Sequence, residues 1–226
     1  MIQAQIRVML VDDHAVVREG YRRLIEKGHD MTVIAEASDG MDAYRLYKAH
    51  EPDVTVIDLS MPGKGGVEVI RHIRKRDQAA KILVFTMHQN AAFAMQAFQA
   101  GARGYITKSS EPKLLIDAIR RVFAGSRIMS PDIGEALALT CVDGKDSLLD
   151  TLSAREFEIF RMFAEAKSTS EIAGTLNLSE KTVSNYRSLI RAKLEIDSDI
   201  ELARLALRLK VVDDSFLSRH DLTSSS

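Results

Sequence analysis

Short apolar stretches alternate with amphipathic helical stretches over the first half of the chain. Five of the apolar stretches have the length and content of buried strands, and each is followed by a segment whose apolar residues recur every three or four positions. This alternation predicts a parallel sheet with helices on both faces. The five expected strands cover residues 6–11, 32–37, 54–58, 81–86 and 104–107, and the last helix ends near residue 124.

Polar side chains stand where four of these strands end. Asp58 follows the apolar run VTVI, Asp12 and Asp13 follow the first strand, Thr86 closes the fourth, and Lys108 follows the fifth. The carboxyl ends of parallel strands lie on one edge of the sheet, so these groups are expected to meet. For Asp58 alone, the alternative is a simple cap of the next turn.

Three carboxylates close together repel one another, and a divalent cation relieves that repulsion. Oxygen ligands of this kind suit Mg²⁺, which readily takes a phosphate oxygen as a further ligand. Lys108 adds a positive charge and Thr86 adds a hydroxyl. Together they predict a site for a transferred phosphoryl group, with Asp58 as the nucleophile.

Residues 6–124 resemble the receiver domain of two-component response regulators. The resemblance is carried by Asp12, Asp13, Asp58, Pro62, Thr86, Tyr105 and Lys108. It implies a Mg²⁺ site made by Asp13, Asp58 and the main-chain carbonyl of Ser60 directly, and by Asp12 through water. It also implies three residues that respond to the phosphoryl group: Thr86 and Lys108, which hold its oxygens, and Tyr105, which changes rotamer when Thr86 moves.

Some positions near this site have plainer alternatives. Tyr105 would look the same as an ordinary core aromatic. His14 and His88 are expected on the surface or at helix caps rather than as ligands, because Mg²⁺ prefers oxygen. Met87 stands where the family usually has a smaller residue, which leaves donor access or phosphate lifetime open to change.

Residues 126–150 are rich in chain-breaking and polar residues and are expected to be mainly a linker, with a short helix near 132–140 as an alternative. The one cysteine of the chain, Cys141, falls in this region and is expected to be an incidental thiol.

From residue 152 onward the pattern is helical. Ser153 with Glu156 and Ser168 with Glu171 form capping-box sequences, and Ser179 is a third expected cap. The segment 170–194 has the pattern of a helix-turn-helix. Four small helices are expected in residues 151–212, followed by a disordered tail at 213–226.

The second helix of that motif has one apolar face and one basic face. Residues 181–193 carry four basic residues and no acidic residue. A helix of this kind fits the major groove of DNA, and the alternative is a solvated basic surface. The polar face that would meet DNA consists of Lys181, Thr182, Ser184, Asn185, Arg187, Ser188 and Arg191.

Residues 152–209 resemble the four-helix DNA-binding domain of the LuxR/NarL type. The match lies in LSAREFEI at 152–159, EIAGTLNLSEKTV at 171–183 and AKL at 192–194. The whole chain resembles NarL/FixJ-class response regulators, and within them the GacA/UvrY-like group. Ala166 departs from the glycine that many relatives have after the first helix, which puts the end of that helix in doubt.

The resemblance implies a transcription factor switched by phosphorylation of Asp58 by a histidine kinase. Release of the basic helix would let a homodimer read inverted-repeat DNA. The expected dimer face is the apolar side of the last helix: Ile200, Leu202, Ala203, Leu205 and Ala206.

Two other classes of function are set against this interpretation. A phosphatase acting through an aspartyl-phosphate typically has a second Asp two residues after the nucleophile, where this chain has Ser60. A protein-interaction switch without DNA binding is disfavoured by the basic helix.

The charge totals, 31 basic and 32 acidic residues, exclude a generally cationic nucleic-acid binder, so any DNA site is local. No run of about 18 apolar residues predicts a membrane span, and the N-terminal segment does not have the pattern of a signal peptide. With one cysteine the chain forms no internal disulfide. A soluble, cytoplasmic protein is expected.

Overall fold

The computed structural model describes residues 5–61, 65–142, 151–176, 178–209 and 211–212. The chain divides into two compact units, residues 1–144 and 145–226. Pro62, Asn177 in the expected turn, and the expected tail at 213–226 lie outside the described residues. No described helix is both long and apolar enough to cross a membrane.

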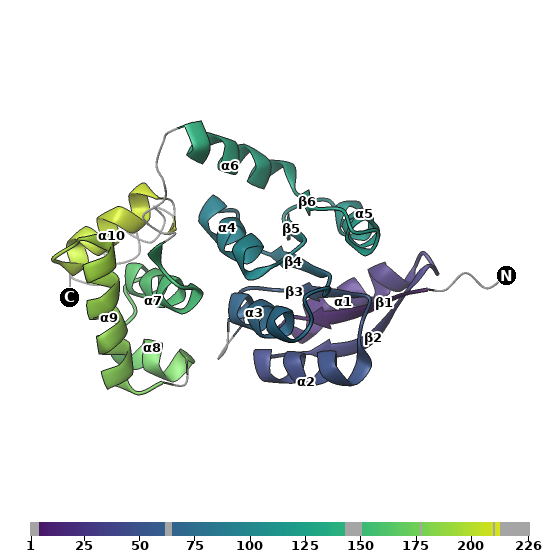
Figure 1. Ribbon diagram of the computed structural model, residues 1–226, viewed down its shortest axis with the longest axis horizontal. Helices are drawn as coiled ribbons and strands as arrows, with labels where there is room; N and C mark the ends of the chain where they lie inside the picture. Colours follow the sequence, from purple (N-terminus) through teal and green to yellow (C-terminus); the bar gives the residue numbers. More distant parts are fainter. Residues whose placement is uncertain (1–4, 62–64, 143–150, 177, 210, 213–226) are drawn as a thin grey trace, which may run out of the picture. The chain divides into compact units, whose positions relative to one another are not determined.

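The first unit is built on a parallel sheet with strand order β2-β1-β3-β4-β5-β6 (Figure 1). The five expected strands are present, and a sixth is added at the edge. They are β1 (Ile6–Val11), β2 (Met31–Ala37), β3 (Val54–Ile57), β4 (Ile82–Thr86), β5 (Gly104–Thr107) and β6 (Ile128–Met129). Every residue of β3, β4 and β5 is buried, which is why these strands are apolar without alternation.

Helices cover both faces of the sheet, as the alternation predicts. They are α1 (Ala15–Glu26), α2 (Gly40–His50), α3 (Gly66–Arg76), α4 (Ala91–Ala100) and α5 (Pro112–Phe123). Helices α1 and α5 pack on one face, where Ile25, Leu115 and Ile119 join the strand residues of the main core cluster. Helices α2, α3 and α4 pack side by side on the other face.

The chain reverses direction across the sheet between β1 and β3. It passes from β1 outward to β2 and returns to place β3 on the other side of β1. Open parallel sheets bind ligands outside the carboxyl ends of the strands at such a point. Gly66 keeps the start of α3 close to this edge, because a Cβ there would collide with the carbonyl oxygen of Asp58 and lie 2.8 Å from the Cα of Leu59.

Residues 128–142 are not a linker, and the alternative interpretation, a short helix near residues 132–140, is confirmed. Strand β6 pairs with β5, and α6 (Pro131–Val142) contacts α4 and β5. Asp132 in the first turn of α6 accepts a hydrogen bond from the Thr107 hydroxyl at 2.9 Å. The open edge of β5 offers unpaired backbone groups that this short segment satisfies. Residues 143–150 and the side chain of Cys141 lie outside the described part.

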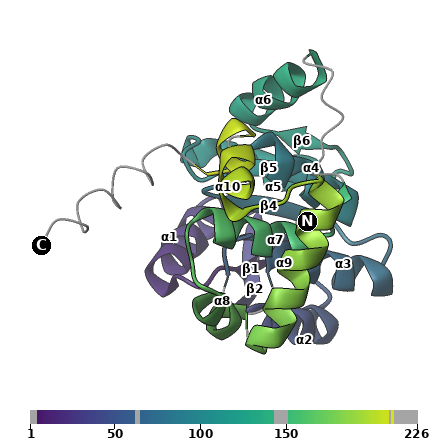
Figure 2. The same ribbon diagram turned by 90° about the vertical axis from the view of Figure 1, so that its left-hand side faces the viewer.

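The described residues of the second unit form four α-helices: α7 (Ala154–Ala164), α8 (Thr169–Leu176), α9 (Glu180–Leu194) and α10 (Asp199–Arg208). Figure 2 shows α8 beside α9, the longest of the four, and the two helices pack against each other. The expected caps at Ser153, Ser168 and Ser179 are formed, and Ser198 with Glu201 adds a capping box that sequence reasoning missed.

The end of α7 follows from the residue at position 166. Helix α7 ends at Ala164, and Ala166 adopts a left-handed conformation with φ of 56°. Its amide donates to the carbonyl oxygen of Phe163 at 2.9 Å. Glycine adopts a left-handed conformation at a lower free-energy cost than alanine does. Ala166 therefore ends the helix in the way that a glycine would, with some backbone strain.

Candidate functional site

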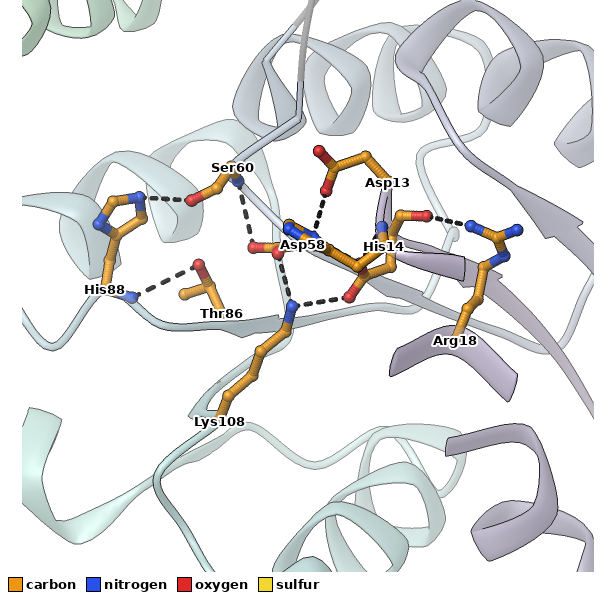
Figure 3. Close-up of polar contacts among 9 residues, drawn as sticks. Asp13, His14, Arg18, Asp58, Ser60, Thr86, His88 and Lys108 are labelled. Carbon is orange, nitrogen blue, oxygen red and sulfur yellow. Dashed lines mark hydrogen bonds and ion pairs between the residues drawn. The ribbon is translucent and has the colours of Figure 1, made fainter. Parts of the chain in front are cut away.

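The carboxyl edge of the sheet brings together the side chains that the sequence placed at the strand ends (Figure 3). Asp12 and Asp58, from the neighbouring strands β1 and β3, are both buried, and Thr86 at the end of β4 is completely buried. Lys108 follows β5 and reaches across to both carboxylates. The predicted convergence of these groups is therefore present.

Lys108 joins the two buried carboxylates. Its Nζ donates to Asp12 Oδ2 and to Asp58 Oδ2, each at 2.6 Å. The side chain of Lys108 is only 8% exposed, so it is not an ordinary solvated lysine. The other oxygen of Asp58 accepts a hydrogen bond from the Ser60 amide at 3.1 Å.

These contacts set the protonation state of the site. Burial by itself raises the pKa of the Asp58 carboxyl, but hydrogen bonds and the charge of Lys108 outweigh it and hold the pKa below the ordinary 3.8. Burial lowers the pKa of Lys108, yet the two carboxylates bring it above the ordinary 10.5. At neutral pH the site therefore contains an ionised Asp58 beside an ammonium group.

Asp13 lies at the open side of the same edge. Its Oδ1 is buried and accepts no hydrogen bond of good geometry, although His14 Nδ1 lies 2.8 Å away. Oxygens of Asp12 and Asp13 and a ring nitrogen of His14 lie within 4.8 Å of one another. An acidic oxygen without a donor fits an oxygen-seeking cation such as Mg²⁺. His14 is exposed at the start of α1, the surface position that the sequence predicts.

Three contacts next to the site were missed by sequence reasoning. The ring of His88 hydrogen-bonds Ser60 Oγ through Nε2 at 2.8 Å and stacks on Phe93 with ring centroids 4.0 Å apart. Arg18 donates to the main-chain oxygen of Asp12 at 2.6 Å. The only signal for the first contact is that Ser60 and His88 each come two residues after a strand-end site residue.

Tyr105 is completely buried, and its hydroxyl donates to the main-chain oxygen of His88 at 2.9 Å. Burial raises the pKa of this phenol well above its ordinary value, so it stays a neutral donor. Met87, between Thr86 and His88, has a side chain that is largely exposed, at 65%.

In the second unit, α9 presents the expected polar face only in part. Lys181, Ser184, Asn185 and Ser188 are exposed. Thr182 is half-buried and shares a 2.8 Å hydrogen bond with Ser179 at the helix start. On the opposite face Val183, Ile190 and Leu194 are buried, as the spacing predicts.

The basic side chains of α9 are mostly paired within their own unit. Lys193 contacts both carboxylate oxygens of the buried Glu156, at 2.8 and 2.7 Å. Arg187 pairs with Asp199, and Arg191 donates to the main-chain oxygen of Asp197 at 2.5 Å. Among the described residues of α9, Lys181 alone of the four basic residues has no such partner.

Three of the five residues of the expected dimer face of α10 are buried within their own unit, and the role of this face in dimer formation stays a prediction. Leu202, Leu205 and Ala206 are buried, and α10 packs on α7 in the same unit. The amphipathic pattern correctly identified an apolar face, but this face fills the core of its own unit. Ile200 is 66% exposed and Ala203 is half-buried.

The first unit has an ionised aspartate, an ammonium group and a hydroxyl at the carboxyl edge of a parallel sheet, and the second unit has a helix-turn-helix. This combination defines the class of response regulators. Residues 8–120 match the response regulator receiver domain. Residues 150–206 match the luxR family of bacterial regulatory proteins. The chain belongs to the LuxR family of two-component response regulators, in which phosphorylation regulates transcription.

Relatives of the same architecture match over most of their length. The chain is 40% identical to the response regulator UvrY of Escherichia coli K12, covering 90% of this chain and 94% of UvrY. It is 40% identical to GacA of Pseudomonas aeruginosa PAO1, covering 92% and 98%. RcsB of Salmonella enterica serovar Typhimurium, solved on promoter P1flhDC with the phosphomimetic BeF₃⁻, is 28% identical with a TM-score of 0.67, over 90% and 99% of the two chains.

Proposed function

We propose that a histidine kinase phosphorylates Asp58 and that this modification controls binding of α9 to promoter DNA. The observation that carries the proposal is the geometry of Asp58, a buried carboxylate kept ionised by Lys108 at 2.6 Å. Such a carboxylate is a competent nucleophile toward phosphorus. In the transfer, a carboxylate oxygen forms the new P–O bond and the P–N bond to the donor histidine breaks.

The residues around Asp58 would stabilise the phosphoryl group once it is attached. The Lys108 ammonium and the Thr86 hydroxyl supply a positive charge and a hydrogen bond to its oxygens. Asp12, Asp13, Asp58 and the Ser60 carbonyl are the oxygen donors that would hold Mg²⁺. The ion supplies charge neutralisation for the incoming phosphoryl oxygens.

Replacing Asp13 with Asn is expected to weaken Mg²⁺ binding by more than about tenfold, since even outer-shell changes cost that much. Asp13 is singled out because its Oδ1 accepts no well-aligned hydrogen bond. Calorimetric titration of the full chain with MgCl₂ measures the change. Asp42→Asn, an exposed carboxylate on α2 paired with Arg45, is the matched control. Unchanged affinity in Asp13→Asn would remove Asp13 from the ligand set.

The contacts of Tyr105 and His88 offer a route from the site to the surface. Movement of Thr86 toward a phosphoryl group pulls on residues 87–88, whose main chain is held by the Tyr105 hydroxyl. Tyr105 would then change its rotamer together with this loop. A two-state element of this kind is what a phosphorylation switch requires.

On the DNA side, the exposed residues Lys181, Ser184, Asn185 and Ser188 would face the major groove, and Arg187 and Arg191 would reach phosphates. RcsB, which is 28% identical to this chain, was solved bound to DNA, and this supports DNA binding as the function of the second unit. A homodimer on an inverted repeat is part of the proposal, as is a cytoplasmic location. If α10 takes part in that homodimer, exposed side chains such as Ile200 would make the contact.

The test is to map the DNA fragments bound in native cells by the natural protein and by Asp58→Ala. Inverted-repeat sites that depend on Asp58 are expected. Equal binding by both proteins would show that phosphorylation of Asp58 does not control DNA binding, and no sites in either would remove the DNA function.

The family is one of regulators rather than classical enzymes. Ser60 stands where a phosphatase acting through an aspartyl-phosphate has the Asp that serves as its general acid. The only reaction proposed for this chain is therefore slow hydrolysis of its own aspartyl-phosphate.

A further inference from the structure

The recognition helix α9 has little free positive charge in the structure. Of its four basic residues, Lys193, Arg187 and Arg191 are occupied by groups of their own unit. Binding to the DNA backbone depends on cationic side chains that neutralise phosphates. Any of these three residues that contacts a phosphate must first leave its internal partner.

The contacts of Lys193, Arg191 and Arg187 with their internal partners differ in burial and geometry. Glu156, the partner of Lys193, has a side chain 5% exposed, and it also accepts a 2.6 Å hydrogen bond from the Ser153 amide. That pair is part of the folded core of the unit. Arg191 is held by a main-chain oxygen and lies 3.9 Å from Asp199.

The pair of Arg187 with Asp199 is of another kind. Arg187 Nε donates to Asp199 Oδ1 at 2.9 Å, and its Nη2 contacts the other oxygen, so the pair is bidentate. The side chains are 34% and 49% exposed. The Arg187 guanidinium also lies over the ring of Phe163, 5.0 Å from the ring centroid. This cation–π contact helps to orient the guanidinium toward Asp199.

A phosphate group can replace Asp199 in this arrangement. Carboxylate and phosphate oxygens accept the same parallel pair of hydrogen bonds from a guanidinium. Arg187 follows the exposed Ser184 by three residues, so the two lie on neighbouring positions of the helix surface. An exposed ion pair contributes little to stability and is easily exchanged.

We propose that Asp199 is an internal competitor for DNA phosphate at Arg187, and so limits the sequence-independent affinity of the protein for DNA. The inference rests on the proposed DNA-binding function. In the free protein Asp199 neutralises Arg187. In the complex the carboxylate remains nearby and competes with the phosphate, so Arg187 of the natural protein makes the phosphate contact in only a minority of the complexes. Because phosphate contacts carry no sequence information, the limit applies to every DNA sequence.

The test uses the full chain, incubated with Mg²⁺ and acetyl phosphate, on a short mixed-sequence duplex. Asp199→Asn is expected to raise the affinity about threefold or more at low salt. The plot of log affinity against log salt is expected to steepen by about 0.9, the value of one additional phosphate contact. Fluorescence anisotropy between about 50 and 200 mM salt measures both quantities.

Two controls separate this mechanism from a general charge effect. Glu195→Gln removes one exposed negative charge of the same unit, and within the described residues the Glu195 carboxylate forms no side-chain hydrogen bond or ion pair. It is expected to produce a smaller gain and no change of slope. In the Arg187→Gln background, Asp199→Asn is expected to have no more effect than Glu195→Gln. Circular dichroism melting checks that each variant is folded.

The inference fails if the natural protein binds the duplex and Asp199→Asn behaves like Glu195→Gln. It also fails if Asp199→Asn weakens binding, since Asp199 would then position Arg187 for DNA. A gain that persists without Arg187 overturns it as well. If neither the natural protein nor any variant binds DNA, the proposed DNA-binding function fails and takes the inference with it.

Discussion

Replacing Asp58 with Asn is expected to abolish phosphoryl uptake from acetyl phosphate in the presence of Mg²⁺. The amide has nearly the shape of the carboxylate, so the fold is retained, but it lacks the anionic oxygen that attacks phosphorus. Asp58 is also the carboxylate of this edge that Lys108 and the Ser60 amide both contact. Intact-protein mass spectrometry measures the added phosphoryl group directly.

Asp117→Asn is the control for this experiment, because Asp117 is an exposed carboxylate on α5 that pairs with Arg120. It is expected to incorporate the phosphoryl group like the natural protein. Stoichiometric labelling of Asp58→Asn, for example on the neighbouring Asp12 or Asp13, would contradict the assignment of Asp58 as the acceptor.

Replacing Lys108 with Met is expected to lower the free energy of unfolding of the first unit by about 3 kcal/mol at pH 7, the usual cost of removing one partner of a buried ion pair. The Asp12 and Asp58 side chains are 9% and 3% exposed, and without the ammonium they face each other as unpaired charges. Urea unfolding followed by circular dichroism, with hydrogen exchange of the β1 and β3 amides to identify the unit, measures the loss.

The dependence on pH has a definite sign. In the natural protein the pKa of Asp58 is lowered, so its contribution to stability is fully present above the unfolded value of 3.8 and is lost as the pH falls through the lower folded pKa. Without Lys108, burial raises the carboxylate pKa, and stability falls as the pH rises above the unfolded value. The deficit of the variant is therefore largest near neutral pH and shrinks toward pH of about 4.

Mg²⁺ provides a second check on the same variant. A cation bound at the acidic edge replaces part of the missing charge, so added MgCl₂ is expected to recover part of the lost stability. Lys113→Met, at an exposed position of α5, should change the stability by less than about 0.5 kcal/mol. If Lys108→Met unfolds like the natural protein at every pH, the ion pair contributes nothing net to the fold.

Residues whose role depends on a local pattern were predictable. The strand ends of a parallel sheet must meet at one edge, so the position of Asp12, Asp58, Thr86 and Lys108 in the sequence was enough to predict that they come together. The capping boxes are local in the same way, because Ser153 and Glu156 satisfy each other within one turn. The buried face of α9 followed from its helical spacing.

Distant partners that no strand-end or helical pattern indicates were not predictable. Ser60 and His88 are 28 residues apart and meet because two loops follow adjacent strands. Glu156 and Lys193 are 37 residues apart, and their ion pair ties one of the four basic residues counted on this helix to the core of its own unit. The two-residue strand β6 has no pattern of its own, and it forms because β5 offers an open edge.

Helix α10 shows most clearly where the sequence stops being sufficient. Its pattern determined that one face is apolar, which is a property of residue order alone. Whether that face packs on a second copy or within its own unit depends on the position of α7. In the structure α10 packs on α7, and Leu202 and Leu205 are buried within their own unit. The sequence by itself determined the parallel sheet, the acidic edge and the helix-turn-helix pattern, because these arise from periodicity and chain order. Only the tertiary structure decided which charges and apolar faces remain free for partners, because burial and ion pairing depend on residues that are distant in the sequence.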